Sequence, residues 1–230
     1  MKTIGLLGGM SWESSLHYYR IINEQVRARL GGLHSARSLM LSVDFDPIEK
    51  MQASGEWDAA GELLGEAAQR LERGGADFVV LCTNTMHKVA DAIAGRIRIP
   101  LLHIADAAAD AVRRAGLRRV GLLGTRFTME QDFYRGRLTD KHGLEVVIPP
   151  DGQRRDVHRI IYDELCRGVV EPRSKEVFLR IIAGLVAAGA EGIILGCTEI
   201  MMLVARQDVE VPLFDTTVLH ASAAVDRALR

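Results

Sequence analysis

The amino-acid sequence predicts an α/β protein of two pseudo-symmetric halves, each a mostly parallel sheet flanked by helices. Short apolar runs that end near glycine alternate with longer helical patterns along its 230 residues, which is typical of parallel strands joined by right-handed crossovers. Three phrases also occur twice, in the same order, 112 to 116 residues apart. We therefore expect a duplicated half, with the active site in the cleft between the two copies.

The repeated phrases pair strands of one half with strands of the other. The pairs are residues 3–9 with 118–125, 75–85 with 189–199, and 97–104 with 209–216. The first half is expected to cover residues 1–106 and the second residues 107–215. The last helix could pack on either half, and we assign residues 216–230 to the first.

Each element is predicted from its own boundary signals. Ser11 is a suitable N-cap for a helix that has Glu13 in its first turn and ends at Gly31. Glycines likewise close most other helices. Strands are expected at residues 2–7, 37–45, 77–82, 97–102, 144–148 and 192–195, and within the repeated phrases 118–125 and 209–216. Further helices are expected at residues 57–73, 105–115, 129–142, 157–167, 174–188 and 218–229, with short ones after Thr83 and Thr198.

The composition excludes several classes of function. The formal net charge is −1, which argues against nucleic acid or a membrane surface as partner. No apolar run approaches the roughly 20 residues of a membrane span. The apolar run at the N-terminus is too short for a signal peptide, so we expect a cytoplasmic protein. Three cysteines do not form a disulfide framework, and the seven histidines show no zinc-binding spacing. No metal site is predicted.

Polar residues follow the two equivalent central strands, at the edge where open α/β sheets place their chemistry. The repeat places Thr83 at the position equivalent to Cys197. A carbon acid held between them would meet Cys197 as base on one face and Thr83, a weaker acid recharged by water, on the other. A thiol has a pKa of about 8.5, and the helix predicted after Thr198 is expected to favour the Cys197 thiolate.

Other polar residues are suited to bind a carboxylate and the enolate that it would become. Met10 and Ser11 are expected to place a carboxylate at the start of the first long helix, although Ser11 could instead be a simple N-cap. Thr125 opens the matching turn of the second half. The phrase GLLGGM lacks the full G-x-G-x-x-G spacing, so a dinucleotide site is not predicted. The remaining donors are Asn84, Thr85 and Thr198.

Three further residues lie near these candidates in the sequence, and two of them have two interpretations each. Cys82 precedes Thr83, and because strand side chains alternate between faces we expect it to be buried and inert. Glu199 either orients Cys197 or acts as a charge at a helix terminus. His87 either reaches back toward Thr83 or is structural.

The quoted motifs resemble the aspartate/glutamate racemase family over nearly the whole chain. The similarity lies in GLLGGM, TNTMH from Thr83 to His87, the GT of Thr125, and GCTE ending at Glu199, and longer phrases are similar to the broad-specificity and L-Asp/Glu-specific racemases. This resemblance implies racemisation without pyridoxal phosphate, by two cysteines that flank the α-carbon. It also implies a homodimer, no cofactor and no metal.

The sequence departs from this family at three places. Thr83 replaces the first catalytic cysteine, so the resemblance assigns deprotonation of the L-amino acid to Cys197 and reprotonation to the Thr83 side. Where several aspartate racemases have an arginine for the distal carboxylate, this chain has Glu49 and Lys50, with Gln52 just beyond as a candidate contact. Cys166 aligns with a substrate-binding lysine.

This interpretation predicts aspartate or glutamate as the substrate. Two other functions stay open. A decarboxylase or isomerase of small carboxylates that uses the single Cys197 is the enzymatic alternative. A non-catalytic amino-acid binding protein is the other, because the loss of the first cysteine could have ended turnover.

Overall fold

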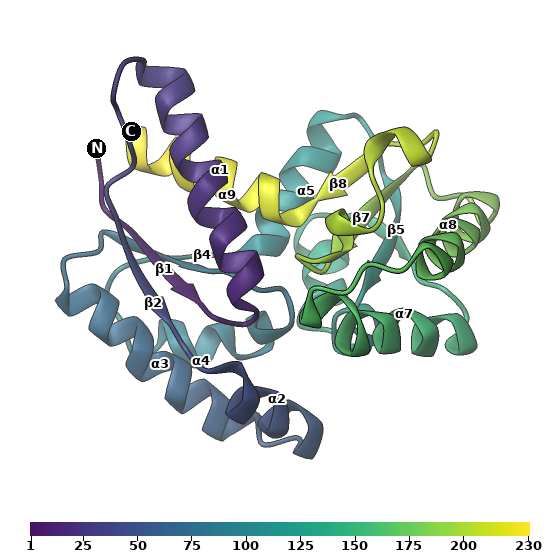
Figure 1. The fold of residues 1–230 in the computed structure, drawn as a ribbon, viewed down its shortest axis with the longest axis horizontal. Coiled ribbons are helices and arrows are strands. Elements are labelled where there is room, and N and C mark those ends of the chain that lie inside the picture. Colours follow the sequence, from purple (N-terminus) through teal and green to yellow (C-terminus); the bar gives the residue numbers. More distant parts are fainter. The chain divides into compact units, whose positions relative to one another are not determined.

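The computed structural model describes residues 1–230 and contains two four-stranded parallel sheets (Figure 1). Their strand orders are β2-β1-β3-β4 and β6-β5-β7-β8, so each strand has an equivalent in the other sheet. The chain separates into two compact units, residues 1–104 with 220–230 and residues 105–219. The α/β fold of two similar halves that the sequence predicts is therefore confirmed.

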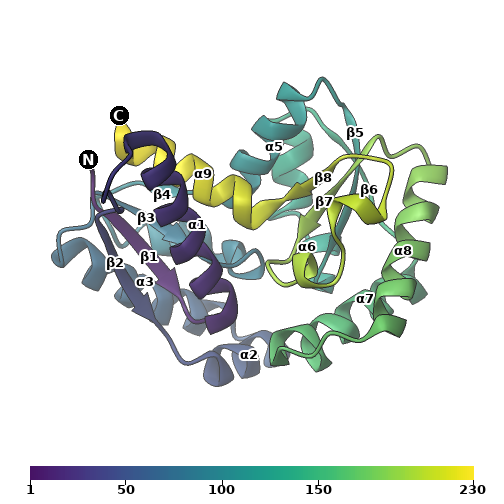
Figure 2. The same ribbon diagram turned by 45° about the horizontal axis from the view of Figure 1, so that its top comes forward.

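The first unit has helices on both faces of its sheet (Figure 2). Its strands are β1 (Ile4–Gly8), β2 (Ser38–Ser42), β3 (Phe78–Leu81) and β4 (Leu101–Leu102). Its helical segments are α1 (Trp12–Leu30), α2 (Phe45–Ser54), α3 (Trp57–Arg73), η1 (Thr85–Val89) and α4 (Ala90–Ala94). Most of the C-terminal helix α9 (Thr216–Leu229) also belongs to this unit.

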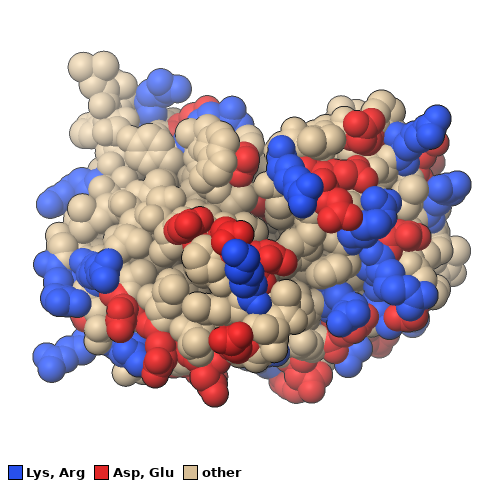
Figure 3. Space-filling model, turned by 60° about the horizontal axis from the view of Figure 1, so that its bottom comes forward, with Lys and Arg blue, Asp and Glu red and all other residues tan.

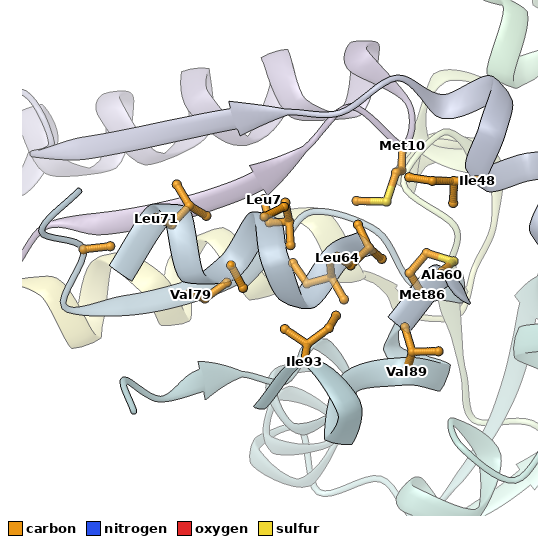
Figure 4. Packing of buried hydrophobic residues seen from close by; sticks show 14 residues of the cluster. Leu7, Met10, Ile48, Ala60, Leu64, Leu71, Val79, Met86, Val89 and Ile93 are labelled. Carbon is orange, nitrogen blue, oxygen red and sulfur yellow. The ribbon is translucent and has the colours of Figure 1, made fainter. Parts of the chain in front are cut away.

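Alternation along the central strands divides the core of this unit into two clusters. Leu7, Val79 and Leu81 point to one face, where residues of α2, α3 and α4 cover them (Figure 4). Phe78, Val80 and the strand residues of even number in β1 point to the other face, against α1 and α9. Both central strands are fully buried, which is typical of a parallel sheet covered on both sides.

The ends of α1 and α9 follow from local signals. Ser11 caps α1 by accepting a hydrogen bond from the Ser14 N–H, and the N–H of Gly31 closes the other end on Arg27, as predicted. Helix α9 packs its alanine-rich face on the α1 side of the sheet, and Lys2 N–H donates to the carbonyl of Ala228 at 2.8 Å.

The second unit repeats this arrangement. Its strands are β5 (Arg119–Gly124), β6 (Glu145–Val147), β7 (Gly192–Gly196) and β8 (Leu213–Asp215). Its helical segments are α5 (Ile104–Arg114), α6 (Arg126–Glu130), η2 (Arg137–Lys141), α7 (Asp151–Asp163), η3 (Leu165–Arg167), α8 (Pro172–Ala187), η4 (Ile200–Met202) and η5 (Arg206–Asp208). Figures 1 and 2 show α5 on the opposite face of this sheet from α7 and α8.

Several predicted elements are wrong in their extent. The helix expected over residues 157–167 begins at Asp151 and ends at Asp163. The strand expected over residues 37–45 stops at Ser42, and α2 begins at Phe45 with Asp44 as its N-cap. Pro47 lies in the first turn of α2, where proline is tolerated because the N–H that it lacks has no intrahelical partner there. The strand expected over residues 97–102 is reduced to Leu101–Leu102.

The helix predicted over residues 129–142 is also wrong, since it is broken into α6 and the π-helical turn η2. Asp106 near the start of α5 holds the second piece: its carboxylate accepts hydrogen bonds from Arg137 at 2.7 and 2.8 Å, from Lys141 at 2.9 Å and from His142 at 2.8 Å. Tertiary ion pairs therefore decide the path of a segment whose local pattern is helical.

Acidic and basic side chains lie intermixed on the face drawn in Figure 3. This mixture is what a formal net charge of −1 leads one to expect. None of the helices has both the length and the apolar character that crossing a membrane requires.

Candidate functional site

The predicted site residues gather, within each unit, where the two central strands end. In the first unit Met10 and Ser11 follow β1, and the segment 83–85 follows the adjacent strand β3. In the second unit Thr125 follows β5, and the segment 197–199 follows β7, whose Gly196 pairs with Gly124. Because both pairs of strands are parallel, each group lies at the carboxyl edge of its sheet, where α/β proteins bind ligands.

Glycine is required in the turn after β1. Gly9 has φ +99, and a Cβ atom on it would lie 2.2 Å from the carbonyl oxygen of Val43. Its N–H donates to Ser15 Oγ at 2.8 Å, and that hydroxyl donates in turn to the Ser11 carbonyl at 2.9 Å. The sequence analysis assigned no role to Ser15. Its hydroxyl fixes the turn that presents Met10 and Ser11.

The turns of the second unit are packed as closely. A Cβ atom on Gly124 would lie 2.6 Å from the carbonyl oxygen of Gly196, so the ends of β5 and β7 approach each other only because glycine is present. Thr125 then caps α6 by accepting from the N–H of Thr128 at 3.3 Å. Thr125 and Ser11 thus have the same N-cap role in the two units.

Cys197 and Glu199 form a buried hydrogen-bonded pair at the end of β7. The Cys197 thiol donates to Glu199 Oε2 at 3.0 Å, and the Thr198 hydroxyl donates to the same oxygen at 2.7 Å. Cys197 is 8% exposed and Glu199 is 3% exposed. Glu199 therefore contacts Cys197, and it also lies at the N-cap of η4, so both interpretations of this residue agree with the structure.

The thiol of Cys197 is held in its protonated form. Burial raises the pKa of this thiol well above its ordinary value, and the charges of Glu199 and of the Cys166 side chain raise it further. The expectation that a helix N-terminus favours the thiolate is wrong, because η4 is a 3₁₀ helix of three residues and a carboxylate lies beside the sulfur. Deprotonation of Cys197 therefore needs an acceptor, and Glu199 is in contact with it.

Cys82 and Thr83 directly follow β3, which ends at Leu81. Cys82 is fully buried in the cluster between the sheet and α1, and burial alone raises the pKa of its thiol. The predicted burial of Cys82 is thus confirmed. Thr83 is 7% exposed, and its carbonyl accepts a hydrogen bond from Nδ1 of His87 at 2.8 Å.

Gln52 is the buried polar residue where the resemblance placed the distal-carboxylate contact. It is 3% exposed, and its side-chain amide donates to Met86 Sδ at 2.9 Å. Met10 and Met86 belong to the same core cluster (Figure 4). Lys50 is exposed and pairs with Asp46 at 2.7 Å, on the surface of α2. Of the candidate groups on α2, the Gln52 amide alone reaches the interior.

The remaining predicted donors are buried at the starts of short helical turns. Asn84 precedes η1, Thr85 is its first residue, and Thr198 lies two residues before η4. All three are at most 5% exposed. The chain contains no group of three or more histidine, cysteine or acidic side chains arranged to hold a metal ion.

Comparisons with known proteins agree with this arrangement. The family model described as Asp/Glu/hydantoin racemase matches residues 7–224. A crystal structure of a candidate Asp/Glu racemase from Yersinia pestis is 57% identical, covers 100% of both chains and superposes with a TM-score of 0.93. An aspartate racemase homologue from Pyrococcus horikoshii OT3 is 35% identical over 100% of both chains, with a TM-score of 0.85. The broad-specificity amino-acid racemase RacX of Bacillus subtilis is 23% identical over 75% of this chain and 74% of its own.

Proposed function

The chain belongs to the Asp/Glu/hydantoin racemase family and is an amino-acid racemase, an isomerase, and we propose that it interconverts L- and D-aspartate or glutamate. The observation that carries this proposal is the pair of Cys197 and Glu199, buried at the carboxyl end of β7. Thr83 follows the equivalent strand β3 in a sheet of the same order. A sulfur and a hydroxyl from equivalent places in a duplicated fold are suited to opposite faces of one α-carbon.

We assign the first proton transfer to the bond between Cys197 and Glu199. The carboxylate takes the thiol proton, and the S–H electron pair stays on sulfur. The thiolate then takes the α-proton of the L-amino acid, and the C–H electron pair stays on the carbon as an enolate. The Thr83 hydroxyl gives a proton to the opposite face and is recharged by water, while Glu199 releases its proton to water, so the net reaction is inversion.

The backbone and side-chain donors at the strand ends are proposed to hold the carboxylates. The start of α1 after Ser11 and the amides and hydroxyls of Asn84, Thr85, Thr125 and Thr198 are suited to the α-carboxylate and its enolate. Gln52 is proposed to reach the distal carboxylate. The side-chain amide of Gln52 donates to the thioether sulfur of Met86, which is a weak acceptor. Donation to a carboxylate oxygen of the substrate in its place is favourable.

The proposal needs no cofactor, because a thiolate and a hydroxyl supply both proton transfers. We also propose that the protein acts as a homodimer in the cytoplasm. The support for these statements is the family and the resemblance of the motifs. Since enantiomers have equal free energies, kcat/KM must be equal in both directions, and the unequal Thr83 and Cys197 groups can differ only in the separate values of kcat and KM.

Incubation with L-aspartate or L-glutamate in D₂O tests the function. The racemase proposal expects deuterium at the α-carbon, read by proton NMR, and the D-isomer, read by chiral chromatography. Cys197→Ser is expected to lower α-proton exchange by about 10²-fold or more while amino-acid binding is retained. Cys82→Ala is the matched control, because Cys82 faces the core, and it should retain exchange.

The same experiment separates the two alternatives. A binding protein would bind the amino acid without any α-proton exchange. A single-cysteine decarboxylase would release CO₂ from a malonate-type substrate and leave L-aspartate unlabelled. Either result would overturn the racemase proposal.

A further inference from the structure

Four buried aromatic side chains connect the carboxyl end of β3 to α1 and α9 in the first unit. His87 and His103 have ring centroids 4.4 Å apart, His87 and His220 are 5.9 Å apart, and Tyr18 contacts His220 edge-on at 5.7 Å. Tyr18, His87 and His220 are at most 2% exposed, and His103 is 7% exposed. None of these rings is used in the proton transfers proposed above.

The hydrogen bonds of His87 fix its tautomer. Nδ1 lies 2.8 Å from the carbonyl oxygen of Thr83, which can only accept, so Nδ1 carries the hydrogen. Nε2 lies 3.2 Å from the backbone nitrogen of Ile104, whose N–H can only donate, so Nε2 is the acceptor. The neutral ring with hydrogen on Nδ1 satisfies both bonds, and burial favours this neutral form more than the backbone contacts to Thr83 and Leu102 favour the charged one.

His220 is fixed by the same reasoning. Its Nε2 donates to the carbonyl of Leu102 at 2.9 Å, so its Nδ1 accepts from the Tyr18 hydroxyl at 2.9 Å. The two histidines thus hold the backbone on either side of residue 103. Ile104 and His220 are also the residues at which the chain leaves and re-enters the first unit.

We propose that neutral His87 is a positioning residue for Thr83, which it ties to the first residue of α5. The bond to the Thr83 carbonyl limits where the backbone of this residue can lie, and so where its hydroxyl points. The bond to Ile104 fixes His87 itself. The effect on turnover rests on the proposed racemase function, whereas the tautomer and the two bonds do not.

Two substitutions separate the bonds because they retain different halves of the imidazole. In His87→Asn the side-chain amide replaces Nδ1 and can still donate to Thr83, but nothing accepts from Ile104. In His87→Gln the amide oxygen reaches the place of Nε2 and can still accept from Ile104, but the donor to Thr83 is lost. His34→Asn, on an exposed histidine, is the matched control.

The expected results differ for each variant. His87→Gln should lower kcat for α-proton exchange by about 10-fold to 100-fold with KM nearly unchanged, because the reacting hydroxyl is displaced. His87→Asn should keep kcat within about threefold of the parent, but amide hydrogen exchange at Ile104 should become much faster. Equal losses of kcat in both variants, with Ile104 protected in both, would overturn the proposal.

A measurement on the unaltered protein keeps the inference testable if the variants do not fold. Long-range proton–nitrogen NMR at neutral pH should show His87 with hydrogen on Nδ1 only and His220 with hydrogen on Nε2 only. An imidazolium or the opposite tautomer at His87 contradicts the proposal. If the unaltered protein exchanges no α-proton, the racemase function fails, but these spectra still decide the positioning role.

Discussion

The Cys197 thiol donates its hydrogen bond to Glu199 Oε2 at 3.0 Å, in a pair that solvent scarcely reaches. The carboxylate has two opposite effects on this sulfur. Its negative charge disfavours a second negative charge on sulfur, which raises the thiol pKa, yet it is also the nearest base that could take the thiol proton. A single substitution can therefore separate thiol reactivity from turnover.

Glu199→Gln is expected to change these two properties in opposite directions. Without the carboxylate charge the pKa of Cys197 falls, so iodoacetamide should modify this residue several-fold faster at neutral pH, measured by mass spectrometry of its peptide. Alpha-proton exchange should fall about 10-fold or more, because no carboxylate takes the thiol proton. Glu191→Gln, at the residue directly before β7, is the control for both the alkylation and the exchange measurement. A slower alkylation of Cys197 in Glu199→Gln would contradict this account.

The duplication explains how much of the fold could be predicted. Asp77 and Glu191 occupy equivalent positions before β3 and β7, and each accepts backbone N–H bonds: Asp77 from Thr3 at 2.6 Å, and Glu191 from Arg118 and Arg119 at 2.9 Å. Because the pattern occurs twice, each copy supports the strands predicted in the other, so the two parallel sheets and the burial of Cys82 could be predicted from the sequence. The glycine-marked ends of α1 and α3 follow as well.

Other features depend on contacts that a local pattern does not contain. The break between α6 and η2 depends on Asp106, which lies about 30 residues earlier in the chain. The raised pKa of Cys197 depends on the burial of its thiol and on the Glu199 carboxylate beside it. The bond from Ile104 to His87 joins residues 17 apart across two elements. The spacing of residues in the sequence could identify these residues as candidates, but it could not predict which of them contact each other.

Acidification below about pH 6.5 should destabilise the protein through His87. Burial lowers the pKa of His87 well below its ordinary value, and the nearby rings of His103 and His220 lower it further. Below the ordinary pKa of about 6.5 the unfolded chain binds a proton that the folded chain does not, so the free energy of unfolding falls as pH falls. Urea unfolding at several pH values between about 7 and 5 should show this slope.

His87→Asn provides the control for this pH dependence. Asparagine does not titrate, so the part of the slope that His87 contributes should disappear even though the variant is less stable at neutral pH. An unchanged slope would assign the pH dependence to other groups.

Asp106→Asn should weaken the attachment of η2 to α5. Burial opposes ionisation of Asp106, but hydrogen bonds from Arg137, Lys141 and His142 outweigh it and hold the carboxyl pKa well below its usual range. Removing the charge weakens these hydrogen bonds and is expected to cost about 1–2 kcal/mol of stability at neutral pH. The loss is no larger because the network is partly exposed and is screened by solvent. Thermal unfolding measures this loss, and Asp140→Asn, on an exposed residue of the same turn, should have little effect.

The pH dependence of the Asp106 network has a definite sign. Because the folded pKa is depressed, this stabilisation is present above the unfolded value of about 3.9 and is lost as pH falls below it. The difference in stability between the parent protein and Asp106→Asn should therefore shrink in acid. A difference that stays constant down to about pH 2 would show that the charge of Asp106 is not its source.

Tyr134→Phe should leave the protein as stable or make it more stable. Tyr134 is fully buried, burial raises the pKa of its phenol, and its hydroxyl oxygen has no hydrogen-bond partner. Burying an unsatisfied hydroxyl costs about 1–3 kcal/mol, so its removal should raise the free energy of unfolding by up to about 1 kcal/mol after repacking. Tyr18→Phe is the matched comparison, because the equally buried Tyr18 hydroxyl donates to His220 at 2.9 Å. That variant should lose about 1 kcal/mol, and a loss of the same size in Tyr134→Phe would show that the Tyr134 hydroxyl is satisfied in solution.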